Sequence, residues 1–219
     1  MQGFARRAAI VLLLLFVASA CRTSPPSSTR PTAPIVQPGA PGESSRVIPP
    51  DKAADLPRPG FTAADVTFMQ GMIGHHAQAI AMTDLLRTRT SSEEMKKLAL
   101  RIAVSQADEI TMMQHWLEAR GQAVPGPHAM HMHGATLMPG MLTPEEMNRL
   151  AEANGTMFDR LFLEGMIKHH GGALTMVKNL FATPGAGQDS EIFAFASDVD
   201  ADQRMEIDRM NAMLKELEK

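Results

Sequence analysis

The sequence is poor in cysteine, in aromatic side chains and in basic charge. It has one Cys, one Trp and no Tyr among 219 residues, and its formal net charge is −3. A single Cys excludes an internal disulfide, and it excludes structural zinc held by several thiolates. The chain lacks the basic stripe that nucleic-acid binding requires, so we expect no nucleic-acid partner. Methionine is abundant, with 18 residues, and its thioether serves both as a core filler and as a soft metal ligand.

The N-terminal residues have the pattern of an export signal. Two arginines at 6–7 precede an apolar run at 8–17, and small residues at 18–20 lead to Cys21. The run is too short to cross a bilayer as a helix of the mature protein. We therefore expect residues 1–21 to direct export, which places the mature protein in the periplasm or at the cell surface.

Cys21 allows two forms of processing. Small residues directly before a Cys resemble a bacterial lipobox, which predicts lipidation of Cys21 and membrane contact through that anchor alone. Ala18-Ser19-Ala20 also fits ordinary secretory cleavage, which would release a soluble protein. We favour the lipoprotein, because a lone free thiol is unusual in an exported protein.

The remaining chain alternates between segments with and without helical periodicity. Residues 22–60 are rich in Pro, Ser, Thr and Gly, and they bury too little apolar surface to offset the entropy of ordering, so we predict a disordered tether. Residues 122–142 form a loop interrupted by Pro and Gly. Apolar periodicity, capping residues and breakers predict five helices in the domain 61–219, which run from Thr62 to Arg87, Met95 to Ala119, Thr143 to Ala153, Thr156 to Phe181 and Ser190 to Leu217.

An internal repeat organises this domain. Residues 68–76, Phe-Met-Gln-Gly-Met-Ile-Gly-His-His, match residues 162–170, Phe-Leu-Glu-Gly-Met-Ile-Lys-His-His. Downstream, a Gln-x-x-Glu-Ile-x-x-Met segment occurs at 106–113 and again at 203–210. Each half, 61–121 and 143–218, is thus a helical hairpin that cannot bury its apolar face alone. We predict an all-α fold, a four-helix bundle of two repeated hairpins with an added short helix.

The repeated motif places imidazole beside thioether on both of its helices. Steps of three and four residues put the second His of each pair on one stripe with a Met, and the first His lies about 100° round the helix. Gly71 and Gly165 are costly inside a helix, by roughly 1 kcal/mol relative to Ala, so their recurrence predicts a close approach by another helix. The candidate metal ligands are His75, His76, His169, His170, Met72, Met82, Met166 and Met176.

Carboxylates on the same stripes and on the partner helices could orient these histidines. A carboxylate near an apolar seam needs a partner, and an imidazole N–H on the facing helix provides one. The candidates for this role are Glu109, Glu206, Asp65 and Asp159. The same residues support an alternative without metal, in which the His pairs are locked to Glu109 and Glu206 and the Met stripe is core packing. His115, beside Trp116, is interpreted as structural.

The donor types favour copper. Ferritin-like di-iron sites use Glu-x-x-His motifs, whereas Glu164 precedes its first His by five positions. This weakens a third hypothesis, a metal-dependent redox enzyme. Imidazole with thioether favours copper, particularly Cu(I). No nucleophile elbow or phosphate loop occurs in the sequence, which favours a binding protein over an enzyme.

The loop provides a second, independent indication. Such short His/Met tracts in exported proteins suit copper capture, although a polar loop with chance Met content gives the same composition. The candidate loop ligands are His128, Met130, His131, Met132 and His133.

The motif at Met72–Met82, its twin at Met166–Met176 and the two Gln-x-x-Glu-Ile-x-x-Met segments resemble the domain of unknown function 305 family. The resemblance implies a secreted bacterial protein of ferritin-like fold. It also implies that His75, His76, His169 and His170 are the functional residues, and some relatives are linked to copper. Gly74 departs from the Pro that many relatives carry. We therefore predict an exported protein that captures, buffers or delivers copper; the alternative is a structural or interaction module of the envelope.

Overall fold

The computed structural model describes residues 35–37, 45–49, 52, 60–126 and 137–219. The chain divides into two compact units, residues 1–57 and 58–219. The export signal with Cys21 and the candidate loop ligands from His128 to His133 lie outside the described residues. None of the described helices combines the length and the apolar character that crossing a membrane requires.

The described part of the first unit contains a short antiparallel strand pair, β1 (Ile35–Gln37) and β2 (Arg46–Ile48). Val36 lies opposite Val47 in this pair. The pair differs from the expectation of a tether without regular structure. Its β-branched residues account for the difference, because they favour an extended backbone even in a segment that is otherwise polar.

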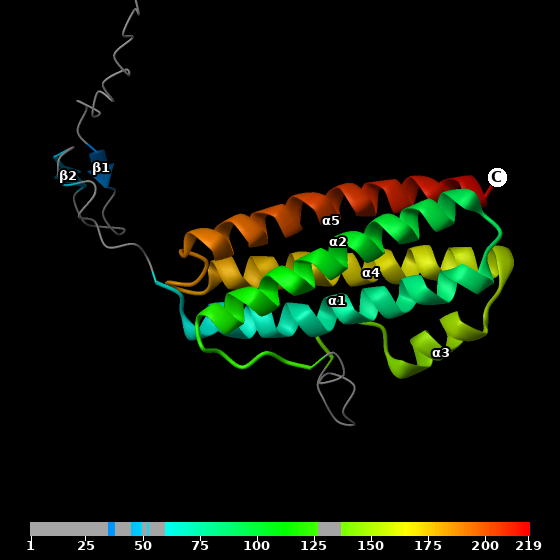
Figure 1. Cartoon of the computed structure of the whole chain (residues 1–219). Helices are drawn as coiled ribbons and strands as arrows, with labels where there is room; N and C mark the ends of the chain where they lie inside the picture. Colours follow the sequence, from blue (N-terminus) through cyan, green and yellow to red (C-terminus); the bar gives the residue numbers. More distant parts are fainter. Residues whose placement is uncertain (1–34, 38–44, 50–51, 53–59, 127–136) are drawn as a thin grey trace, which may run out of the picture. The chain divides into compact units, whose positions relative to one another are not determined.

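The second unit is all-helical, as the periodicity predicts. Two long antiparallel hairpins, α1 with α2 and α4 with α5, pack together through α1 and α4, and α3 packs on α4. Figure 1 shows that α1 and α5 run in one direction and that α2 and α4 run in the other. The bounds are α1 (Ala63–Arg89), α2 (Glu93–Ala119), α3 (Pro144–Glu152), α4 (Gly155–Ala182) and α5 (Ser190–Leu217).

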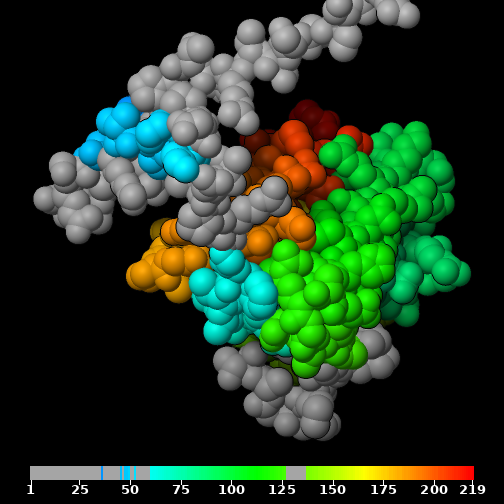
Figure 2. Space-filling view, turned by 60° about the vertical axis from the view of Figure 1, so that its left-hand side comes forward, coloured from blue at the N-terminus to red at the C-terminus, as the bar shows by residue number. Residues whose placement is uncertain are grey.

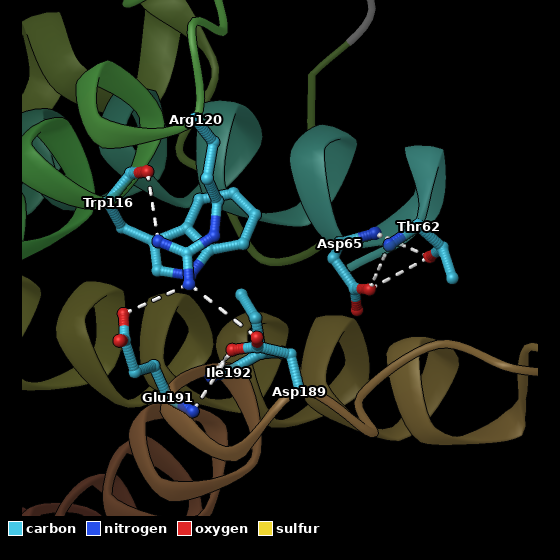
Figure 3. A network of polar contacts seen from close by, with 7 residues as sticks. All are labelled: Thr62, Asp65, Trp116, Arg120, Asp189, Glu191 and Ile192. Carbon is cyan, nitrogen blue, oxygen red and sulfur yellow. Dashed lines mark hydrogen bonds and ion pairs between the residues drawn. The ribbon is translucent and has the colours of Figure 1, made fainter. Parts of the chain in front are cut away.

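Capping residues fix the start of α1 and the end of α2. Thr62 and Asp65 form a capping box at the start of α1 (Figure 3). Asp65 also accepts the Gly187 N–H at 2.7 Å. Gly121 ends α2 with a φ of 64°, which a glycine adopts without strain. Gln122 then donates its N–H to the Leu117 carbonyl at 2.9 Å. These contacts fix the hairpins at one end of the bundle, where Figure 2 shows the starts of α1 and α5 close to the end of α2.

The start of α4 differs from the prediction. The sequence predicts that Thr156 and Asp159 open this helix, in the way that Thr62 and Asp65 open α1. Instead, α4 begins at Gly155, with Asn154 as an N-cap whose side chain makes no capping hydrogen bond. Gly155 has a φ of 58°, so the glycine takes the chain from α3 into α4 before Thr156 is reached.

The apolar core of the bundle consists of two clusters. One contains Met72 and Trp116, near the start of α1 and the end of α2, and the other contains Met82 and Met166. Along every long helix the two clusters are separated by polar residues, all buried except the half-buried Glu109. This middle layer consists of His75 and His76 from α1, Gln106 and Glu109 from α2, His169 and His170 from α4, and Gln203 and Glu206 from α5.

Candidate metal centre

The second histidine of each pair is held by a carboxylate from the partner helix of its own hairpin. His76 Nε2 lies 2.6 Å from Glu109 Oε2, and His170 Nε2 lies 2.7 Å from Glu206 Oε2. Both imidazoles are fully buried, and the exposed fraction of the carboxylate side chain is 20% for Glu109 and 7% for Glu206. The structure therefore brings together two residue pairs that the repeat singled out.

Each carboxylate has a second polar neighbour, a hydrogen-bond donor for Glu109 and an ion-pair partner for Glu206. Ser105 donates its hydroxyl to Glu109 Oε1 at 3.0 Å, and Arg101 lies 3.7 Å from Glu206 Oε1. Arg101 belongs to α2 and Glu206 to α5, so this ion pair links the two hairpins. Burial alone would raise the pKa of Glu109. The hydrogen bonds from His76 and Ser105, with the charge of His76, outweigh burial and lower the pKa below its ordinary value of 4.5.

The first histidine of each pair is held by backbone carbonyls. His75 Nε2 donates to the Pro139 carbonyl at 3.0 Å, and His169 Nε2 donates to the His75 carbonyl at 2.9 Å. The His75 and His169 rings are 3.8 Å apart between centroids and tilted by 35°. Because ring lone pairs lie in the ring plane, two rings stacked in this way do not aim their nitrogens at a common ion.

All four histidines share one pattern of hydrogen bonding. Carbonyl and carboxylate oxygens only accept, so each Nε2 must carry the proton. Each Nδ1 is buried, and among the described residues none of the four Nδ1 atoms has a hydrogen-bond partner. A nitrogen oriented through the opposite N–H is the arrangement that metal-bound histidines show.

Burial keeps two of these imidazoles neutral. Desolvation, followed by the charge of His76, lowers the pKa of His75 from 6.5 to about 3. Desolvation, followed by the charge of His75, also lowers the pKa of His169 well below 6.5. A neutral imidazole with its proton on Nε2 presents a lone pair on Nδ1, which is the form that binds metal.

The middle layer contains further buried polar atoms without partners among the described residues. These are Oε1 of Gln106 and both amide atoms of Gln203. Buried polar groups are nearly always satisfied, so such a concentration marks the layer as a place where another polar species could be bound.

The predicted thioether ligands occupy different surroundings. Met72 and Met166 are fully buried, each in one of the apolar clusters. The nearest neighbours of Gly71 and Gly165 are Met138 and Leu142 of the connecting segment, and the predicted neighbours from another helix, Met176 and Met82, come second. Within the region that the structure describes, no three His, Cys, Asp or Glu side chains gather in a way that could hold a metal ion. A metal site there would need thioether ligands or a rotation of the rings.

The two aspartates lie away from the histidines along their helices. Asp65 is ten positions before His75, about 15 Å along the axis, and its described bonds are to Thr62 and Gly187. It caps α1 in place of orienting a histidine. Asp159 occupies the matching position of α4, is 6% exposed, and has one carboxylate oxygen without a hydrogen-bond partner among the described residues.

Part of the predicted loop 122–142 also belongs to the site. We call residues 137–142 the strap. Gln78 clamps it by donating to the Leu142 carbonyl at 2.9 Å and accepting the Leu142 N–H at 2.7 Å. A Cβ placed on Gly172 would lie only 1.9 Å from the Pro139 carbonyl oxygen. The Pro139-Gly140 and Gly171-Gly172 dipeptides are the only sequence features that indicate a close backbone approach, and no local pattern predicts that they contact each other.

The fold and this layer define a class of protein: a duplicated helical-hairpin bundle with paired histidines buried at its middle. The family model described as "Domain of unknown function (DUF305)" matches residues 65–214. The chain belongs to the DUF305 family.

Solved structures share the fold. A DUF305 protein of Streptomyces coelicolor, described as secreted, is 32% identical, with 70% of this chain and 93% of that chain covered and a TM-score of 0.60. CopM in its Cu(II)-bound form is 30% identical, with 69% of this chain and 96% of that chain covered and a TM-score of 0.57. CopM is also known in Cu(I)-bound and silver-bound forms.

One curated relative matches a shorter stretch. Uncharacterized protein L153 of Acanthamoeba polyphaga mimivirus is 39% identical over 56 residues, which is 26% of this chain. The match spans only 37% of the length of the viral protein.

Proposed function

We propose that this protein binds copper outside the cytoplasm and serves to capture, buffer or deliver the ion. The observation that carries the proposal is the set of four buried Nδ1 atoms without described partners, each on an imidazole whose Nε2–H is already donated. The similarity to CopM, known in Cu(II)- and Cu(I)-bound forms, supports copper as the ion. The similarity to a DUF305 protein described as secreted supports export, and lipidation of Cys21 is our proposal for how the protein is retained.

The residues fit the chemistry of such an ion. Glu109 and Glu206 hold the Nε2–H of His76 and His170, which raises the basicity of Nδ1 and fixes the ring. His75 and His169 are neutral, so no proton has to be displaced before an ion binds. Thioethers, with Met72 and Met166 one helical turn before His76 and His170 as candidates, would favour Cu(I) over Zn(II). Separation of the stacked His75 and His169 rings is the movement that we expect on binding.

A structural role is the second candidate, and one observation favours it. Every Nε2 is committed to a carboxylate or carbonyl, and the His75 and His169 rings already stack. On this hypothesis the layer fixes the register of the two hairpins and binds no ion. The two hypotheses differ in what metal does to the Nδ1 resonances.

The test is titration of the purified protein with Cu(I), Cu(II), Zn(II) and Fe(II), followed by ¹⁵N NMR of the imidazoles. The loop is removed as a competitor by changing His128, His131 and His133 to Gln and Met130 and Met132 to Leu. We expect diamagnetic Cu(I) to shift the Nδ1 resonances of the paired histidines while each Nε2 keeps its proton, and paramagnetic Cu(II) to broaden the same resonances.

Variants then locate the site. His75→Gln and His170→Gln each keep a side chain that can donate to the same oxygen, and each should weaken copper binding by about tenfold or more. His115→Gln is the matched control, because His115 is exposed on α2, and it should bind as the parent does. Equal copper affinity in all three variants would show that the paired histidines are not copper ligands. Unchanged Nδ1 resonances at saturating copper would support the structural hypothesis, in which the layer binds no ion.

A further inference from the structure

The two repeats differ at equivalent glycines. A Cβ placed on Gly71 would lie 3.1 Å from Met138 Sδ and 3.5 Å from Met176 Cε. At Gly165 the matching neighbours are Leu142 Cδ2, at 3.2 Å, and Met82 Cε, at 3.3 Å. The first glycine therefore faces two thioether side chains, whereas the second faces one thioether and a hydrocarbon.

The two positions also differ in exposure. Met138 and Met176 are half-buried and line an open groove of about 480 Å³ between the first half of α1 and the last half of α4. At the other glycine, Met82 and Leu142 are 0% and 4% exposed. An ion from solvent can thus reach the thioether pair beside Gly71, but it cannot reach the sulfur beside Gly165 without movement of the core.

The lining of this groove selects for a particular kind of ion. Its described lining residues carry no charge: Ala64, Thr67, Phe68, Gly71, Met138, Pro139, Met176, Asn179, Leu180 and Thr183. Hard divalent cations require carboxylate or water-rich sites, and Zn(II) prefers imidazole, thiolate or carboxylate. Thioethers are neutral and soft, and they suit Cu(I) and the similarly soft Ag(I).

The strap joins this groove to the first histidine pair. Met138 precedes Pro139, whose carbonyl accepts the His75 N–H at 3.0 Å, so adjacent residues line the groove and hold the imidazole. The strap is seated by the contact of Pro139 and Gly140 with Gly172 and by the Gln78 clamp on Leu142. Its position is therefore set by packing and hydrogen bonds that do not involve the thioethers.

We propose that this groove is a separate surface site for a soft univalent metal ion, with Met138 and Met176 as ligands, at the entrance to the His75 side of the buried layer. The proposal rests on the copper binding proposed above and adds an entry site that the second repeat lacks. The two repeats would then be unequal, with the first filled from solvent through the groove.

The test uses protein labelled with ¹³C at the methionine methyl groups, with the same five loop residues replaced, and Cu(I) added anaerobically in substoichiometric steps. We expect the Met138 and Met176 methyl resonances to shift before any histidine resonance moves. Zn(II) should leave both methyl resonances in place. Ag(I), which has the same preference for thioethers, should reproduce the Cu(I) shifts.

Two sets of matched variants, one at methionines and one at glycines, sharpen the test. Met138→Leu and Met176→Leu conserve volume, so the fold should persist, and each should weaken the first Cu(I) equivalent by about tenfold or more. Met205→Leu, a change at a Met that is 55% exposed on α5, should have no effect. Gly71→Ala should displace the Met138 sulfur and weaken Cu(I) binding with every ligand still present, whereas Gly165→Ala should leave the groove intact.

The outcomes separate this proposal from the proposed function. Cu(I) that shifts histidine resonances while both methyl resonances stay in place would overturn the groove site and leave copper binding by the layer. Equal Cu(I) affinity in Met138→Leu, Met176→Leu and Met205→Leu would overturn it as well. An absence of any Cu(I) binding would remove both proposals.

Discussion

The imidazole rings of His75 and His169, equivalent residues of the two repeats, lie 3.8 Å apart between their centroids. This contact lies where α1 and α4 pack together. Each ring buries the other, and the His75 carbonyl also accepts the His169 N–H. The innermost part of the layer therefore exists only when both hairpins are paired.

Burial of these two rings predicts a marked acid sensitivity of the metal-free protein. The pKa of His75 is about 3 in the folded protein against 6.5 ordinarily, and the pKa of His169 is also lowered. Below pH 6.5 the unfolded chain therefore binds protons that the folded protein does not, and stability falls as pH falls. Each buried imidazole should contribute a slope of about 1.4 kcal/mol per pH unit, measured by urea unfolding at several pH values.

The measurement should be made between pH 6.5 and 4.5. The lowered pKa of Glu109 also makes stability fall with falling pH, but only below its ordinary value of 4.5, so this window reports the histidines. His75→Gln should lose one of the two contributions to the slope, and His115→Gln, at an exposed position, should lose none. A slope that His75→Gln leaves unchanged would contradict the assignment.

The carboxylate partners should differ in their contributions to stability. Glu206→Leu leaves the buried His170 N–H without an acceptor and should lower the free energy of unfolding by about 2–3 kcal/mol. Glu109→Leu should cost about 1–2 kcal/mol, since Glu109 is more exposed than Glu206 and its carboxylate is already partly solvated. Glu164→Leu is the surface control on α4. The prediction fails if Glu109→Leu proves the more damaging change.

Adjacent glycines on α4 should respond in opposite ways to alanine. A Cβ on Gly172 collides with the Pro139 carbonyl, so Gly172→Ala should displace the strap and cost about 3 kcal/mol. Gly171 has no neighbouring atom within 4 Å of such a Cβ, so Gly171→Ala should stabilise α4 by up to about 1 kcal/mol. Thermal unfolding measures both, and ¹⁵N NMR of His75 reports loss of the Pro139 hydrogen bond. Equal stability in the two variants would show that the strap is not seated on Gly172.

Arg120, at the end of α2, forms ion pairs with Asp189 and Glu191 at the start of α5 (Figure 3). Its guanidinium lies 4.3 Å from the Trp116 ring centroid and 3.2 Å from a Glu191 oxygen. A Lys cannot stack and pair in this geometry, so Arg120→Lys should cost about 1–2 kcal/mol. Arg204→Lys, which changes an exposed pair on α5, should stay within about 0.5 kcal/mol. Fluorescence of Trp116, the only Trp, follows unfolding in both variants. Equal losses of unfolding free energy would show that Arg120 contributes no more than an ordinary surface ion pair.

Much of the fold could be predicted because its signals are local. Thr62, Gly121 and Asp189 stop or start helices through bonds to residues at most a few positions away. Periodicity shows which face of each helix is buried, and the repeat shows that the two hairpins are alike. The prediction for the start of α4 was wrong. The repeat predicts a cap at Thr156, whereas the short connection from α3 turns at Gly155.

The sequence by itself determined the paired helices and the residue types of the layer, since spacing along a helix sets which side chains share a face. Only the tertiary structure decided which atoms of those residues have hydrogen-bond partners within the described part of the chain. Partners such as Pro139 for His75 and Met176 for Gly71 come from distant segments, and no local pattern encodes their meeting. The strap makes the two repeats unequal for the same reason: the repeated motif fixes each hairpin, but His75 donates to Pro139 of the strap, whereas the equivalent His169 donates to the His75 carbonyl.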